Sequence, residues 1–162
     1  MDHLLKLLSD GNFHSGEALG QSLGVSRAAV WKKLKTLEGL GLQLDSVHGR
    51  GYRLHPGVEL LDREAILSGL DEQVLHQAEV LTVLQTTSTM DMAHQLGVEH
   101  GNKTVFCLAE HQSHGRGRRG RAWSNPFGST ISLSVRWQHS EGMPSLEGLS
   151  LAIGLGVLQA LE

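Results

Sequence analysis

The fold of this chain is constrained most by one stretch, Gly115-Arg116-Gly117-Arg118-Arg119-Gly120-Arg121. Its three glycines let the backbone adopt turn conformations that most residues avoid, and they expose N–H groups there. Its four arginines add rigid guanidinium groups that match the oxygens of phosphates and carboxylates. This composition predicts a loop rather than a helix or a strand, and we expect this glycine-arginine loop, residues 115–121, to close on an anionic ligand.

The same loop permits two other interpretations. The glycine spacing satisfies the G-x-G-x-x-G pattern of dinucleotide-binding folds, and residues 104–109 would supply the preceding strand. That pattern requires a helix to open at the loop, whereas here the chain continues into Trp-Ser-Asn-Pro-Phe-Gly and an alternating apolar segment. The second alternative, a merely solvated basic loop, needs neither three glycines nor Trp123 directly after the arginines. A ligand-binding loop is therefore favoured.

Composition narrows the class of protein. The chain has 162 residues, 40% of them hydrophobic, which suffices for one to two domains with a core. The net charge of −3 is unevenly distributed, because residues 1–57 carry seven Lys/Arg against five Asp/Glu and residues 58–162 carry seven against twelve. Cys107 is the single cysteine and lies in an apolar run, which excludes an intramolecular disulfide and indicates a core position rather than a nucleophile. The sequence shows no signal peptide and no run of eighteen apolar residues, so we expect a cytoplasmic protein with no membrane partner.

The first 57 residues predict three helices. Leucines at positions 4, 5, 7 and 8 predict a short amphipathic helix. Ser15 is placed to cap a second helix that stops at Gly24, and Ser26 is placed to cap a third. The third helix has one apolar face, which we expect to be buried and which is formed by Val30, Leu34 and Leu37.

The other side of the third helix is largely cationic. A short turn around Gly24 joins this helix to the second one, as in a helix-turn-helix that enters the major groove of DNA. The alternating residues 42–54 then predict a hairpin, or wing, with Arg50 at its tip. A solvated helix face is the alternative for the lysines, but the turn, the cap and the basic wing together favour DNA binding. The residues expected to contact DNA are Ser26, Arg27, Ala28, Trp31, Lys32, Lys35 and Arg50.

Residues 58–162 predict a mixture of helices and strands. We expect a helix over 63–70, strands over 80–85 and 104–109, a half-buried strand over 130–137 and a helix over 145–162. Ser88 and Thr89 follow the first of these strands, where a hydroxyl most often caps the next helix. His111 and His114 lie before the glycine-arginine loop without cysteines or carboxylates at ligand spacing, so we expect no metal site. The last helix has no stop signal and the sheet has few strands, so we expect the chain to be part of a longer protein.

Several of these motifs together resemble one family. The helix-turn-helix, Ser88-Thr89, the stretch from Glu110 through the glycine-arginine loop to Trp123, and Phe127-Gly128 are similar to bifunctional biotin-protein ligases that also repress the biotin operon. The resemblance implies an α+β protein with two domains. Residues 1–57 would form a winged helix-turn-helix, and residues 58–162 would form part of a mixed α/β catalytic domain like that of class II aminoacyl-tRNA synthetases.

The resemblance also implies a reaction and a set of ligands. Such an enzyme forms biotinyl-5'-AMP from biotin and ATP with Mg²⁺, passes the biotin to a lysine of a biotin carboxyl carrier protein, and binds operator DNA as a homodimer. Arg118 would be the catalytic residue. The residues implied to bind biotin and the adenylate are Ser88, Thr89, Met90, Gln112, Gly115, Arg116, Gly117, Arg118, Arg119, Arg121 and Trp123.

This chain departs from the family pattern in three respects. Met90 stands where many relatives have Asn, Ala122 stands where a lysine is common, and the family's Lys-Trp-Pro-Asn-Asp motif is not among these residues. Two rival functions therefore stay open. One is a transcriptional regulator that senses a small ligand without ligase activity. The other is an interaction module whose arginine loop grips an acidic partner.

Overall fold

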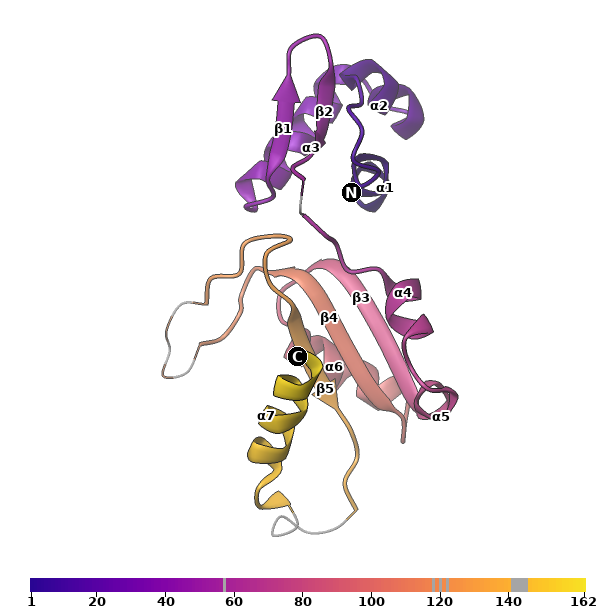
Figure 1. The fold of residues 1–162 in the computed structure, drawn as a ribbon, viewed down its shortest axis with the longest axis vertical. Coiled ribbons are helices and arrows are strands. Elements are labelled where there is room, and N and C mark those ends of the chain that lie inside the picture. Colours follow the sequence, from indigo (N-terminus) through magenta and orange to yellow (C-terminus); the bar gives the residue numbers. More distant parts are fainter. Residues whose placement is uncertain (57, 118, 120, 122, 141–145) are drawn as a thin grey trace.

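Three helices and a two-stranded hairpin form the first part of the chain (Figure 1). The computed structural model describes residues 1–56, 58–117, 119, 121, 123–140 and 146–162. The elements of this first part are α1 (Asp2–Leu8), α2 (Gly16–Leu23), α3 (Arg27–Gly39), β1 (Leu44–Val47) and β2 (Gly51–Leu54). The two strands pair antiparallel, with Leu44 opposite Leu54. The predicted helix-turn-helix and wing are confirmed.

The ends of these helices are fixed by the residues that the sequence indicated. The Ser15 hydroxyl accepts a hydrogen bond from the N–H of Ala18 at 3.0 Å, and the Ser26 hydroxyl accepts one from Ala29 at 3.2 Å. Each bond satisfies an N–H that a helix start otherwise leaves without a partner. Gly24 ends α2 with φ at +65°, a left-handed conformation that glycine adopts without strain.

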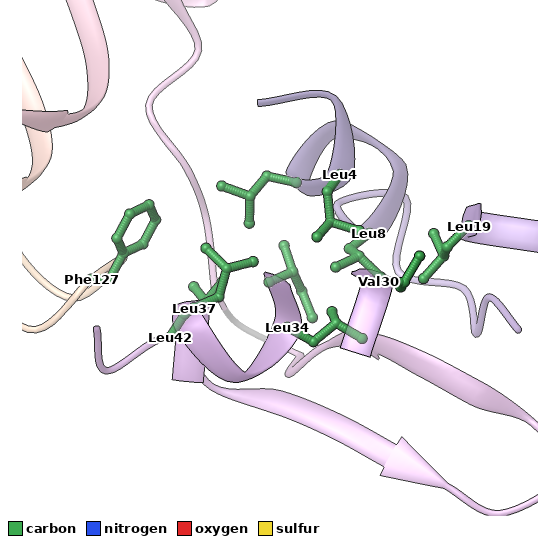
Figure 2. Close-up of a cluster of buried hydrophobic side chains, with 10 residues drawn as sticks. Leu4, Leu8, Leu19, Val30, Leu34, Leu37, Leu42 and Phe127 are labelled. Carbon is green, nitrogen blue, oxygen red and sulfur yellow. The ribbon is translucent and has the colours of Figure 1, made fainter. Parts of the chain in front are cut away.

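A single apolar cluster holds this first part together (Figure 2). The predicted face of α3 is buried in it, since Val30, Leu34 and Leu37 are at most 2% exposed. Phe127 is also buried in the cluster, although it comes from the second part of the chain. The buried members are Leu4, Leu5, Leu8, Leu19, Val30, Leu34, Leu37, Leu42, Leu54 and Phe127.

A three-stranded mixed sheet with helices forms the second part (Figure 1). Its elements are α4 (Arg63–Ser68), α5 (Glu72–Gln77), β3 (Ala78–Thr86), α6 (Thr89–Glu99), β4 (Thr104–Gln112), β5 (Ser132–Arg136) and α7 (Leu149–Ala160). The strand order is β3-β4-β5, with β3 and β4 parallel and β4 and β5 antiparallel. The α+β class is confirmed. Cys107 is buried in β4, as predicted, and burial raises the pKa of its thiol.

Several element boundaries differ from the prediction. The helix expected over residues 63–70 ends at Ser68, and α5 was not predicted. Strand β4 runs to Gln112 rather than stopping at residue 109, because parallel pairing with β3 continues to Thr86. Gln112 is therefore held in the sheet and is not part of the loop that follows.

Strand β5 is half-buried as predicted, but its polar side faces inward. Ser132 is buried, whereas Leu133 is 51% exposed. The inward side lies against α6, where Gly97 leaves room for the Arg136 side chain; a Cβ on Gly97 would come within 2.4 Å of Arg136 Cδ. The apolar alternation thus marked the open face of the strand.

Helix α7 confirms the helical pattern predicted near the end of the chain. None of its residues is buried, and Leu151, for example, is 78% exposed. Its apolar residues therefore contribute nothing to either cluster of buried side chains. Within the described ranges, no helix combines the length and apolar character needed to cross a membrane.

Candidate functional site

Two parallel strands bring the predicted biotin residues to one edge of the sheet. Because β3 and β4 run side by side in the same direction, the α6 start that follows β3 lies beside the end of β4. The Thr89 N–H and the Thr89 hydroxyl both donate to Gln112 Oε1, at 2.8 and 3.0 Å. Ser88, directly before them, is 4% exposed and caps α6 by accepting from the Asp91 N–H at 3.4 Å. The crevice outside the carboxyl ends of parallel strands is where open α/β sheets bind ligands.

The resulting polar cluster, Ser88, Thr89, Gln112 and Ser134, joins three elements. Ser134 of β5 shares a hydrogen bond of 2.8 Å with the Thr89 hydroxyl. Gln112 Oε1 is occupied by Thr89, whereas Nε2 donates no hydrogen bond to any residue that the structure describes. The amide nitrogen is therefore available as a donor for a neutral, hydrogen-bonding ligand. Met90 follows in α6 and is 56% exposed.

The glycine-arginine loop starts directly beside this polar cluster. The Ser113 and His114 N–H groups donate to the carbonyls of Thr86 and Thr87, at 2.9 and 3.0 Å, which fixes the start of the loop to the β3–α6 junction. Arg116 then forms an ion pair with Asp91 in the first turn of α6, at 2.8 Å. Both side chains are more than half exposed, and an exposed pair of this kind contributes about 0–1 kcal/mol. Arg116 can therefore exchange Asp91 for an anionic ligand at little cost.

Gly115 and Gly117 are needed for a reason that differs from the predicted one. Neither has φ in the left-handed region, so the expectation that they supply unusual turn conformations was wrong. Instead, the returning chain approaches them closely. A Cβ on Gly115 would lie 2.6 Å from Trp123 Cδ1, and a Cβ on Gly117 would lie 2.5 Å from the Arg121 carbonyl oxygen. Gly117 also donates its N–H to that oxygen at 3.2 Å.

The remaining predicted loop residues are only partly described. Arg119 and Arg121 are exposed, and Arg119 has φ at +59°. Trp123 is 56% exposed, so its side chain is not part of the core. Arg118, the predicted catalytic residue, lies outside the described residues, as does Ala122.

The structure adds three residues that sequence reasoning missed. Asp91 holds Arg116, and Ser134 contacts Thr89. Asn125 is 4% exposed and lies against the end of β4. The position of Asp91 in a first helical turn was a usable signal, because carboxylates there are favoured by the helix dipole. Nothing in the local sequence distinguished the other two.

The two histidines near the loop are engaged within the protein. His111 Nδ1 donates to the Asn125 carbonyl at 3.0 Å, and its ring stacks on Phe127 with centroids 6.4 Å apart. His114 Nδ1 lies 3.0 Å from the Ser113 hydroxyl. Among the described residues, no group of three or more His, Cys, Asp or Glu is arranged to hold a metal ion.

The predicted DNA-binding residues lie on the surface of the first part. Ser26 caps α3 at its start, and Trp31 is 51% exposed beside the exposed Lys32. Lys35 forms an ion pair with Glu38 at 2.5 Å. The predicted DNA-binding residues that belong to α3 are all exposed to solvent: Arg27, Ala28, Trp31, Lys32 and Lys35.

The wing carries two arginines in different situations. Arg50 lies over the Phe13 ring at 4.4 Å and Arg53 over the same ring at 4.5 Å. Arg53 also pairs with Asp45 at 2.9 Å. Hydrogen bonds from His55 and Arg53 lower the pKa of the Asp45 carboxyl. Arg53 is therefore neutralised locally, whereas Arg50 keeps its charge available for phosphate.

Comparison with known proteins matches both parts of the chain. Residues 1–53 match a family model described as an HTH domain, and residues 80–162 match the biotin/lipoate A/B protein ligase family. The chain is 41% identical over 159 residues to the bifunctional ligase/repressor BirA of Salmonella typhimurium, and 40% identical to the protein of that name from Escherichia coli. It is 30% identical over 161 residues to BirA of Bacillus subtilis.

These alignments cover 98% of this chain but only 48–49% of each relative. The chain thus spans about half the length of the curated relatives that it matches. The ligase-family match covers about half of the chain and includes the polar cluster and the glycine-arginine loop. The chain belongs to the biotin/lipoate A/B protein ligase family and carries a helix-turn-helix domain at its front.

Proposed function

We propose that this protein is a biotin-protein ligase that also represses transcription. It forms biotinyl-5'-AMP from biotin and ATP and transfers the biotin to a lysine of a biotin carboxyl carrier protein. The observation that carries the proposal is the adjacency of two chemically different groups. A neutral polar cluster with a free amide donor lies at the end of β4, and the cationic glycine-arginine loop starts three residues later, at Gly115.

The polar cluster suits the head group of biotin. That head group is an uncharged urea with N–H donors and a carbonyl acceptor, so it requires neutral hydrogen-bonding partners rather than charges. Thr89 and Gln112 offer hydroxyl and amide groups that are ordered by their mutual hydrogen bonds, and the Ser88 hydroxyl is ordered by the bond that it accepts from the Asp91 N–H. Met90 offers an adaptable apolar side chain for the ring carbons.

The glycine-arginine loop suits the charges of the reaction. A biotin carboxylate oxygen attacks the α-phosphorus of ATP and pyrophosphate leaves, so two anions must approach one another. Guanidinium groups and backbone N–H groups reduce this repulsion and stabilise the charge that develops. Arg116, Arg118, Arg119 and Arg121 are assigned this task, with Arg118 as the catalytic group.

The second step also depends on the loop. The acceptor lysine amine attacks the acyl carbon and AMP leaves, so the mixed anhydride must survive until the acceptor arrives. Closure of the loop would shield the anhydride from water. Gly115 and Gly117 would allow the backbone to approach closely, and Trp123 would be available to pack on the adenine. Mg²⁺ would enter with ATP, because it is commonly bound through substrate phosphates with few protein ligands.

The repressor function is assigned to residues 1–57, with residues 58–162 assigned to the ligase domain. Arg27, Lys32 and Lys35 would face the major groove and Arg50 would contact backbone phosphate. The protein would bind its operator as a homodimer, since a dimer with two-fold symmetry places its two helix-turn-helix domains on two symmetric half-sites. Both activities would take place in the cytoplasm.

The ligase proposal is tested by incubating the protein, as its gene encodes it, with biotin, ATP, Mg²⁺ and a biotin carboxyl carrier protein. Mass spectrometry of the acceptor should show one added biotin on a lysine. Gln112→Ala should slow the transfer at least tenfold. Gln95→Ala removes an exposed amide from α6 and should leave the transfer unchanged. An acceptor that stays unmodified while operator binding responds to biotin would instead identify a ligand-sensing regulator.

A further inference from the structure

The last residue of β4 lacks a strand partner on one side. The β4–β5 ladder begins only at Ala109, opposite Ser132, so β5 does not reach Gln112. The neighbouring Ser113 N–H points toward β3 and bonds to the carbonyl of Thr86. Successive residues of a strand point their N–H groups in opposite directions, so the backbone groups of Gln112 face the open side. Gln112, whose side chain holds the polar cluster together, therefore sits where the sheet itself provides support on one side only.

The side chain of Asn125 takes the place of the missing strand. The Asn125 amide is oriented so that both its oxygen and its nitrogen form hydrogen bonds. The oxygen accepts from the Gln112 N–H at 2.9 Å and from the Ser132 hydroxyl at 3.1 Å. The nitrogen donates to the Gln112 carbonyl at 3.2 Å. A side-chain amide carries the same donor and acceptor as a peptide group, so it completes the ladder for one residue. Asn125 is 4% exposed, so water does not compete for these bonds.

Asn125 is itself fixed from two directions. His111 donates to its carbonyl at 3.0 Å, which ties the same segment to β4 a second time. Two residues later, Phe127 donates its N–H to the Leu40 carbonyl at 3.0 Å and packs into the apolar cluster of the first part. The amide is thus held by a segment whose own position is determined by the end of α3.

We propose that Asn125 is a positioning residue for the biotin site, acting through Gln112. By holding the backbone of Gln112 from the side that β5 does not reach, it sets where the Gln112 amide meets Thr89 and where its free nitrogen points. This inference rests on the proposed ligase function. It assigns to Asn125 a role in affinity for biotin and no contact with biotin.

The test is a double-mutant cycle on biotin affinity, measured by titration calorimetry with the protein as its gene encodes it. Asn125→Ala should weaken biotin binding by about tenfold, the factor that corresponds to 1.4 kcal/mol. In a Gln112→Ala background the same substitution should cause no further loss, because its route to the ligand has been removed. Equal losses in the two backgrounds, or no loss in the first, would overturn the proposal.

Two controls separate positioning from general destabilisation. Val105→Ala removes a fully buried side chain from the β4–α6 cluster and should lower the melting temperature without changing biotin affinity. If Val105→Ala and Asn125→Ala weakened biotin binding equally, general destabilisation would explain the effect of Asn125→Ala, and the proposal would be refuted. Ser132→Ala removes only the hydroxyl that bonds the Asn125 oxygen, and it should weaken biotin binding about twofold or more, even where Asn125→Ala is too unstable to purify.

The cycle also distinguishes failure of the inference from failure of the proposed function. Unchanged biotin affinity in Gln112→Ala alone would remove the polar cluster from the biotin site and would defeat both. A loss in Gln112→Ala with none in Asn125→Ala would defeat only the positioning role.

Discussion

The two parts of the chain are stabilised in different ways. In the first part, nine leucine and valine side chains and the inserted Phe127 form one buried apolar cluster. In the second part the corresponding cluster has three buried members, Ala93, Val105 and Cys107, while the apolar side chains of α7 and the outer face of β5 stay exposed. The carboxyl end of β4 in the second part is instead ordered by hydrogen bonds among Thr89, Gln112, Asn125 and Ser134.

This difference separates stability from function within one chain. Burial of apolar surface is non-directional and gives the first part most of its stability. Hydrogen bonds contribute less net free energy but fix the direction of donors and acceptors, which a binding site needs. Phe127 connects the two, because it is buried in the first part and lies two residues from Asn125 in the second.

The largest expected effect on stability comes from removing the Phe127 side chain, which connects the two parts. Phe127→Ala removes a side chain that is 2% exposed, and losses of buried aromatic side chains cost about 3–5 kcal/mol. Because the ring belongs to the same buried cluster as Val30, Leu34 and Leu37 of α3, amide hydrogen exchange in α3 should accelerate, although residue 127 belongs to the other part. Ile131→Ala, at a residue 72% exposed in the same region, should leave this exchange unchanged. Unaltered exchange in Phe127→Ala would mean that the two parts are not connected in this way.

A second pair of substitutions compares a buried leucine of the first part with an exposed leucine of α7. Leu34→Ala should reduce the free energy of unfolding by about 2–5 kcal/mol, because its side chain is 2% exposed in the first cluster. Leu151→Ala in α7 should change it by less than about 0.5 kcal/mol, because its side chain is 78% exposed. Urea denaturation measures both. Similar losses in the two variants would show that α7 is packed in solution.

A third prediction separates the surface of the first part from its core. Lys32→Ala should leave the free energy of unfolding within about 0.5 kcal/mol of the parent, since the side chain is exposed. It should nevertheless weaken binding to a DNA duplex and reduce the slope of log affinity against log salt concentration by about 0.9. Lys103→Ala, at an exposed lysine of the second part, serves as the matched control. An identical slope in both variants would exclude Lys32 from the interface.

The smallest expected effect on stability comes from Glu110, whose carboxyl group is buried in the second part. Burial raises its pKa above the ordinary 4.5, although a hydrogen bond from the Leu61 N–H opposes the shift. A raised carboxyl pKa means that the contribution of this group to stability is complete below pH 4.5 and is lost as pH rises through the folded-state pKa. Glu110→Gln keeps the acceptor for Leu61 and should therefore raise the melting temperature at pH 8 more than at pH 4. A melting-temperature difference independent of pH would contradict this account.

Local signals in the sequence determined most of the first part. Ser15, Gly24 and Ser26 fix helix ends through bonds to residues at most four positions away, and the spacing of Val30, Leu34 and Leu37 fixes the buried face of α3. Such features depend on short-range geometry, so they can be read from the chain directly. The convergence of Thr89 and Gln112 on one edge also follows from sequence, once β3 and β4 are taken as parallel neighbours.

Tertiary structure alone decided the features that depend on contacts between distant residues. The insertion of Phe127 into the first cluster, the support of Gln112 by Asn125 and the inward polar face of β5 all depend on residues brought together by folding. Gly115 and Gly117 show the same division, because the sequence indicated that glycine is needed there, but only the return of the chain past Trp123 and Arg121 gives the reason. A pattern along the chain records which conformations a segment favours, whereas the identity of its neighbours is settled only when segments far apart in sequence pack together.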